Sequence, residues 1–128
     1  MYAGRERHSS ARFENRGYPQ RAIRTANYLY IRNYHPELWP SGDPQVLLKN
    51  GEPGSVHGAY LDIDDGPTLQ FYKKTNVTDP VLMPLFQATM AKRPAEELYD
   101  LQSDPSCLVN LAGKQEYDSI WKTLATQL

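Results

Sequence analysis

The hydrophobic and polar positions of this chain predict an antiparallel hairpin in its first third. Residues 21–25 and 28–34 carry β-branched and aromatic side chains in alternation with polar ones, and a short Asn-containing turn separates the two arms. In the second arm the tyrosines and Arg32 share one face. Leu29 and Ile31 share the other, which we expect to face the core.

Two further patterns extend this prediction toward the C-terminus. Residues 97–101 alternate polar and apolar side chains and predict a short strand that joins the hairpin. Shorter helices are predicted at 67–74 and 80–92, whereas residues 1–20 and 35–66 predict loops because they show no regular period or are broken by Pro and Gly. Apolar residues at helical spacing predict a final amphipathic helix, and they are Tyr117, Ile120, Trp121, Leu124 and Leu128.

These elements define an α+β fold, in which a small antiparallel β-sheet is covered by the C-terminal amphipathic helix. A chain of 128 residues fits a single domain, residues 1–128, with one modest core. No apolar run approaches the roughly 18 residues that a membrane span needs, and no apolar signal region is visible, so we expect no membrane partner. The only cysteine, Cys107, has no second cysteine for an internal disulfide.

Charge is distributed unevenly along the chain. Residues 1–35 contain seven Arg, no Lys and two Glu, whereas the rest carries seven cations and thirteen acids. Arginine presents a planar fork of donors that suits carboxylate, sulfate or phosphate, so this segment favours recognition of an oxyanion. Pairing of these arginines with the acidic remainder or with a neighbouring domain is the alternative. The net charge of -1 and the lack of a recognition motif argue against a nucleic-acid partner.

Three segments carry a resemblance to a known family. They are G-R-E-R-H at 4–8, Y-P-Q-R-A-I-R-T-A-N-Y-L-Y-I-R-N at 18–33, and E-E-L-Y-D-L-Q-S-D-P at 96–105 with N-L-A downstream. Their order resembles the C-terminal subdomain of sulfatases, most closely of the heparan N-sulfatase (sulfamidase, N-sulfoglucosamine sulfohydrolase) type. The resemblance implies a subdomain of an alkaline-phosphatase-like enzyme that degrades a glycosaminoglycan, with the N-terminal catalytic domain absent from this chain.

The same resemblance implies that catalysis lies elsewhere. Sulfatases use a formylglycine made from the Cys or Ser of a C-x-[P/A]-x-R motif, but Cys107 is followed by Leu108, Val109 and Asn110. We therefore expect no catalytic residue here, and the Ca²⁺ and formylglycine of the parent enzyme would belong to its catalytic domain, the expected partner. Three aspartates at 62, 64 and 65 lack the spacing of a calcium loop, so no metal site is expected. By analogy the parent is exported (periplasmic or secreted) or lysosomal.

The expected role of this chain is to contact a sulfated saccharide. The resemblance places the loop that contains Glu6, Arg7 and His8 beside the substrate pocket, and Arg21 and Arg24 of the hairpin could reach an anionic glycan. Ion pairs with acids of the sheet or of a neighbouring domain are the alternative role for these residues. The alternative function is a stand-alone anion or glycan-binding module. A detached subdomain should leave apolar surface uncovered and tend to associate, with a homo-oligomer as one outcome.

Overall fold

The computed structural model describes residues 1–6, 12–55, 59–74 and 79–128, and these residues fall into two compact units. The sheet unit comprises residues 1–6, 18–36 and 93–128, and the described residues of the loop–helix unit are 12–17, 37–55, 59–74 and 79–92. The expectation of a single domain over residues 1–128 stays a prediction.

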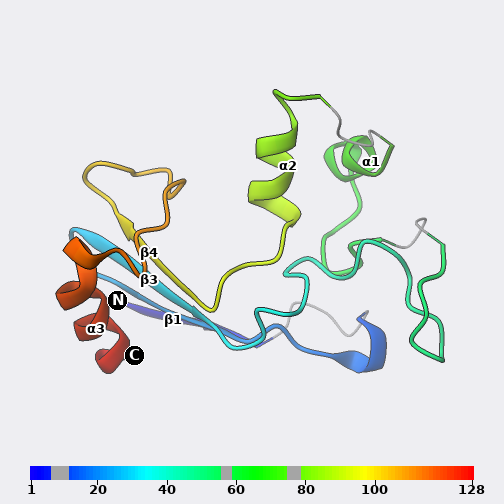
Figure 1. Ribbon diagram of the computed structural model, residues 1–128. Coiled ribbons are helices and arrows are strands. Elements are labelled where there is room, and N and C mark those ends of the chain that lie inside the picture. The colour runs from blue at the N-terminus through cyan, green and yellow to red at the C-terminus, as the bar shows by residue number, and fades with distance from the viewer. Residues whose placement is uncertain (7–11, 56–58, 75–78) are drawn as a thin grey trace. The chain divides into compact units, whose positions relative to one another are not determined.

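The sheet unit contains a four-stranded antiparallel sheet in the order β1-β2-β3-β4 (Figure 1). Its strands are β1 (Tyr2–Arg5), β2 (Gln20–Arg24), β3 (Tyr28–Asn33) and β4 (Glu96–Asp100). The predicted hairpin of β2 and β3 and the added strand β4 are confirmed. The hairpin turn is closed by Thr25, whose Oγ1 accepts hydrogen bonds from the backbone N–H groups of Asn27 and Tyr28.

The loop prediction for residues 1–20 was wrong at its start, because Tyr2–Arg5 forms the edge strand β1. All four residues of β1 are exposed, so neither face imposes the alternation of hydrophobic and polar side chains that identifies a strand. Backbone pairing holds this strand instead. The Arg24 N–H donates to the Met1 carbonyl at 2.8 Å, and the Met1 nitrogen donates to the Arg24 carbonyl at 2.9 Å.

The C-terminal helix α3 (Asp118–Gln127), preceded by the short 3-10 helix η3 (Gln115–Tyr117), lies against one face of the sheet (Figure 1). This confirms the α+β architecture and the predicted amphipathic helix. The sheet contributes three buried side chains to this core, Ile23, Tyr30 and Leu98. Helix α3 contributes Leu124, and the segment that precedes η3 contributes Leu111.

The expectation that Leu29 and Ile31 face this core was wrong. Tyr30 is fully buried in it, and Leu29 and Ile31 are only partly buried on the opposite sheet face. A tyrosine can be buried when its hydroxyl finds an acceptor, and the Tyr30 hydroxyl donates to Glu96 Oε1 at 2.6 Å. The acceptor comes from β4, which lies far along the chain.

The loop–helix unit contains η1 (Phe13–Asn15), α1 (Pro67–Lys74) and α2 (Met83–Met90). Helix α1 has the predicted bounds. Helix α2 begins later than predicted because a turn at Asp79 precedes it, in which the Asp79 carboxylate accepts the Val81 N–H at 2.8 Å. The small core of this unit consists of Ala59, Tyr60, Leu69 and Met90. No helix in the described part of the chain has the length and apolar character to cross a membrane.

Candidate functional site

The structure brings together two of the five predicted site residues. The Arg21 guanidinium forms an ion pair with the Glu6 carboxylate. Arg24 lies three residues from Arg21 along β2, at an exposed position beyond Ile23, and by strand alternation its side chain belongs to the opposite sheet face. Arg7 and His8 lie outside the described residues.

Arg21 belongs to a row of four side-chain positions that crosses all four strands. The register pairs Gly4 of β1 with Arg21 of β2, Arg21 with Arg32 of β3, and Arg32 with Glu96 of β4. This row lies on the same sheet face as Tyr30 and Leu98, because residues two apart in a strand share a face. One part of that face is therefore covered by α3, and the part that contains this polar row is more open, with Arg32 exposed.

The lack of a side chain at Gly4 makes room for Arg21. A Cβ atom at this position would lie 3.2 Å from Arg21 Cδ and 3.5 Å from its Nε. The Arg21 side chain thus extends across β1 to Glu6, and its Nη1 donates to the Gln20 carbonyl at 2.8 Å. Both members of the ion pair remain accessible to water, so a ligand could exchange with the carboxylate.

Arg32 and Tyr34 complete this surface, and sequence reasoning did not select either of them. The Tyr34 ring centroid lies 5.9 Å from the Arg21 guanidinium carbon and 5.7 Å from that of Arg32. Tyr34 is 49% exposed. The sequence did contain an indication, since strand alternation puts Arg32 and Tyr34 on the same face. The same pattern is equally typical of ordinary surface residues.

Glu96 connects the polar row to the core. It accepts the hydrogen bond from the buried Tyr30 hydroxyl, as described above. Burial, followed by this hydrogen bond and by the Glu96 charge, raises the pKa of Tyr30 well above its ordinary value. We call the group of Glu6, Arg21, Arg32, Tyr34 and Glu96 the arginine–tyrosine surface.

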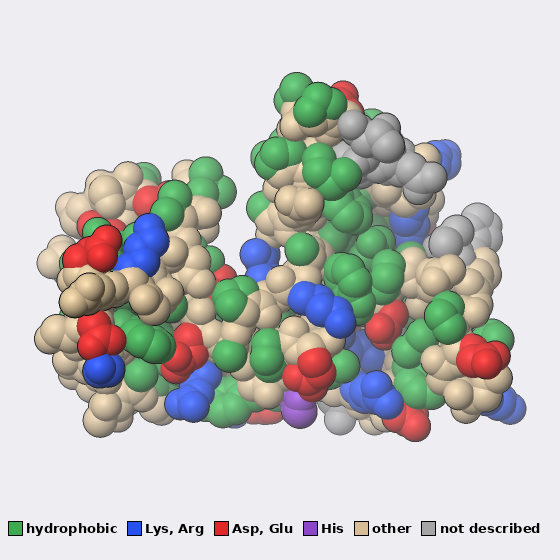
Figure 2. All heavy atoms as spheres, viewed as in Figure 1, with side chains coloured by type: hydrophobic (Ala, Val, Ile, Leu, Met, Phe, Trp, Pro, Cys, Tyr) green, Lys and Arg blue, Asp and Glu red, His purple; other side chains and the backbone are tan. Residues whose placement is uncertain are grey.

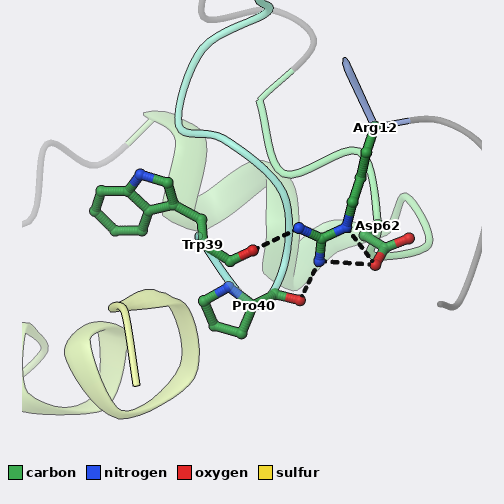
Figure 3. Close-up of polar contacts among 4 residues, drawn as sticks. All are labelled: Arg12, Trp39, Pro40 and Asp62. Atoms are coloured by element: carbon green, nitrogen blue, oxygen red, sulfur yellow. Dashed lines mark hydrogen bonds and ion pairs between the residues drawn. The ribbon is translucent and has the colours of Figure 1, made fainter. Parts of the chain in front are cut away.

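Another arginine of the same sequence segment has a different environment. Arg12 and Asp62 form a buried ion pair in the loop–helix unit, with Arg12 Nε 2.9 Å from Asp62 Oδ2 (Figure 3). Arg12 Nη1 donates to the Trp39 carbonyl at 2.6 Å, and its Nη2 donates to the Pro40 carbonyl at 2.5 Å. Sequence reasoning did not select Arg12, and considered Asp62 only as a calcium ligand. This pair joins segments fifty residues apart and acts as scaffold.

The resemblance implies two groups for the centre of a sulfatase, a calcium ion and a formylglycine. No three His, Cys, Asp or Glu side chains within the described ranges converge where they could hold a metal ion. Cys107 is half-buried, and burial together with the nearby Asp104 carboxylate raises the pKa of its thiol. Its downstream neighbours also differ from the C-x-[P/A]-x-R motif, so neither Ca²⁺ nor formylglycine fits the described residues.

Comparison with known proteins finds a similarity between this chain and a sulfatase. This relative is an ulvan-active sulfatase from Formosa agariphila, with 32% identity over 126 residues. The match includes 93% of this chain, and the chain spans only 18% of the length of that relative. No family model and no solved structure matches the chain significantly.

Proposed function

We propose that this chain is the C-terminal part of a larger sulfatase that acts on sulfated saccharides, and that it completes the substrate pocket without supplying the nucleophile. The observation that carries this proposal is the unequal extent of the match, which includes nearly all of this chain but a small share of the sulfatase relative. The relative's name ties that protein to ulvan. For this chain a heparan N-sulfatase specificity stays a prediction, drawn from the sequence resemblance.

Uncovered apolar side chains favour a part of a larger protein over a stand-alone module. Val81 is 74% exposed, and Leu85 of α2 is 55% exposed. Hydrophobic side chains are visible at the surface of α2 in Figure 2. Helices of soluble proteins place such residues against a neighbour, so we propose that the catalytic portion of the sulfatase covers part of this surface.

Arg21 and Glu6 are the residues through which this chain would contact the saccharide. A guanidinium presents paired donors to two oxygens of a sulfate group, and Glu6 holds the side chain of Arg21 over Gly4 in advance. Glu6 can also accept hydrogen bonds from sugar hydroxyls. Arg7 and His8 stay in the proposal on the resemblance alone. The predicted saccharide contact of Arg24 stays a prediction, since the geometry does not bring it to this group.

The first test of the proposal is to sequence the open reading frame that encodes this chain. We expect an upstream C-x-[P/A]-x-R motif and, in the protein that the frame encodes, hydrolysis of sulfate from a sulfated saccharide. Substitution Arg21→Ala should raise KM for that substrate more than it lowers kcat, because Arg21 contacts the saccharide away from the reacting bond. Arg16→Ala is the matched control, as Arg16 forms a similarly exposed ion pair with Glu14 in the other unit.

A second measurement separates the two functions considered for the chain. Calorimetric titration of the 128-residue chain with glucosamine N-sulfate and short heparin fragments should show no saturable binding if the pocket needs the catalytic portion. Saturable binding that is lost in Glu6→Ala and Arg21→Ala would instead favour the stand-alone module. A frame without the upstream motif, together with such binding, would overturn the sulfatase proposal.

A further inference from the structure

The positive charge of Arg32 is not fully compensated by the side chains around it in the described part of the chain. It is directly opposite Arg21 on the neighbouring strand, and like charges in such a cross-strand position destabilise a sheet. Glu6 pairs with Arg21, whereas no ion pair is found between Arg32 and an acid in the part of the chain that the structure describes. Glu96, its other cross-strand neighbour, accepts the Tyr30 hydroxyl.

Tyr34 adds an aromatic surface beside the Arg32 guanidinium. Tyr34 is half exposed, and the guanidinium carbons of Arg21 and Arg32 both lie within 6 Å of its ring centroid. An exposed contact of this kind contributes little to stability, so packing alone gives no strong reason to place a tyrosine here. An aromatic face next to a guanidinium fits a sugar that bears an anionic group, because the C–H groups of the sugar ring pack on the aromatic face while the guanidinium binds the oxyanion.

We propose that Arg32 and Tyr34 form a second saccharide contact beside the Arg21–Glu6 pair. Arg32 binds a sulfate or carboxylate group on the sugar, and the Tyr34 ring packs against the ring of the same sugar. Its ligand class rests on the proposed function, but its residues and geometry do not. The two arginines thus bind two anionic groups of one saccharide, which relieves their mutual repulsion.

Binding measurements test this contact, and they use the full-length protein that the reading frame encodes. The probes are an N-sulfated heparin disaccharide and its N-acetylated counterpart without sulfate, both of which carry a uronate carboxylate. We expect Arg32→Ala to weaken binding roughly tenfold, Arg32→Lys to restore part of the loss, and Tyr34→Ala to weaken binding several-fold while Tyr34→Phe does not. Arg16→Ala, in the other unit, is expected to bind as the unmodified protein does.

The two probes identify the group that Arg32 binds. A loss confined to the sulfated probe assigns sulfate to Arg32, and an equal loss for both probes assigns the carboxylate. Affinity unchanged in both Arg32→Ala and Tyr34→Ala, with affinity reduced in Arg21→Ala, would overturn this inference and leave the proposed function intact. A protein that binds neither probe would overturn the inference. The proposed function is tested separately, by the presence of the upstream motif in the reading frame and by the release of sulfate from a sulfated saccharide.

Discussion

Arg12 and Arg21 come from one arginine-rich stretch of sequence, yet they occupy opposite environments. The Arg12 side chain is 4% exposed, and its guanidinium donates to a buried carboxylate and two carbonyl oxygens. The Arg21 side chain is 39% exposed, and its partner Glu6 is 66% exposed. Both form ion pairs, but removal of one partner leaves a charge without solvation only where water is excluded. Burial therefore makes the first pair part of the scaffold, and exposure leaves the second pair available to a ligand.

The largest effect should follow from breaking the buried pair. Arg12→Ala removes the guanidinium that pairs with the Asp62 carboxylate in a site closed to water, so we expect the free energy of unfolding to fall by about 3–5 kcal/mol. Urea denaturation followed by tryptophan fluorescence measures this loss, since Trp39 belongs to the site.

Removing both charges of the pair provides the control for that experiment. The double variant Arg12→Met with Asp62→Leu leaves no uncompensated charge, so its stability should lie much closer to that of the unmodified chain. A loss of less than about 1 kcal/mol in Arg12→Ala alone would show that water reaches Asp62 and that the two arginines differ less than the geometry indicates.

A smaller effect is expected where the core meets the arginine–tyrosine surface. Tyr30→Phe removes the hydrogen bond to Glu96, and hydrogen bonds to charged groups contribute about 1.5–3 kcal/mol. Urea denaturation at pH 8 measures the change. Tyr28→Phe is the control, because Tyr28 is a partly buried tyrosine packed against the same core. Equal losses in the two variants would mean that the Tyr30 hydroxyl does not stabilise the fold through Glu96.

Alkaline pH should weaken the fold through the same tyrosine and through Tyr99. Burial and hydrogen bonds to Glu96 and Glu97 raise the pKa values of Tyr30 and Tyr99 above the ordinary value of 10.0. The unfolded chain then releases these protons first, so stability is complete below pH 10 and falls above it, by at most about 1.4 kcal/mol per pH unit for each tyrosine. Denaturation at pH 9 and 11 measures the slope, and Tyr30→Phe should reduce it. An unchanged slope in that variant would contradict the assignment.

The contrast between the two arginines also shows what sequence patterns could predict. Alternation and helical spacing predicted β2, β3, β4 and α3, because one face of each contacts the core. The exposed edge strand β1 left no such pattern. The inward position of Tyr30 depends on a carboxylate from β4.

Partners that are distant in sequence explain the rest of the difference. The pair of Arg12 and Asp62 spans fifty residues, and no local pattern distinguishes Arg12 from the arginines around it. The family resemblance directed attention to Glu6, and the hairpin pattern to Arg21, and the structure joins the two residues. Arg32 and Tyr34 become recognisable only when the register places Arg32 opposite Arg21.

The smallest effect on stability should come from the exposed pair. Arg21→Ala and Arg16→Ala each remove a solvent-exposed ion pair, and such pairs contribute about 0–1 kcal/mol. Arg16 and Glu14 are 46% and 61% exposed, which makes them a close match for Arg21 and Glu6. Urea denaturation should give the two variants nearly the same stability. With stability equal, a loss of saccharide binding in Arg21→Ala alone reports a ligand contact. A loss of several kcal/mol in Arg21→Ala would instead make Arg21 a scaffold residue like Arg12.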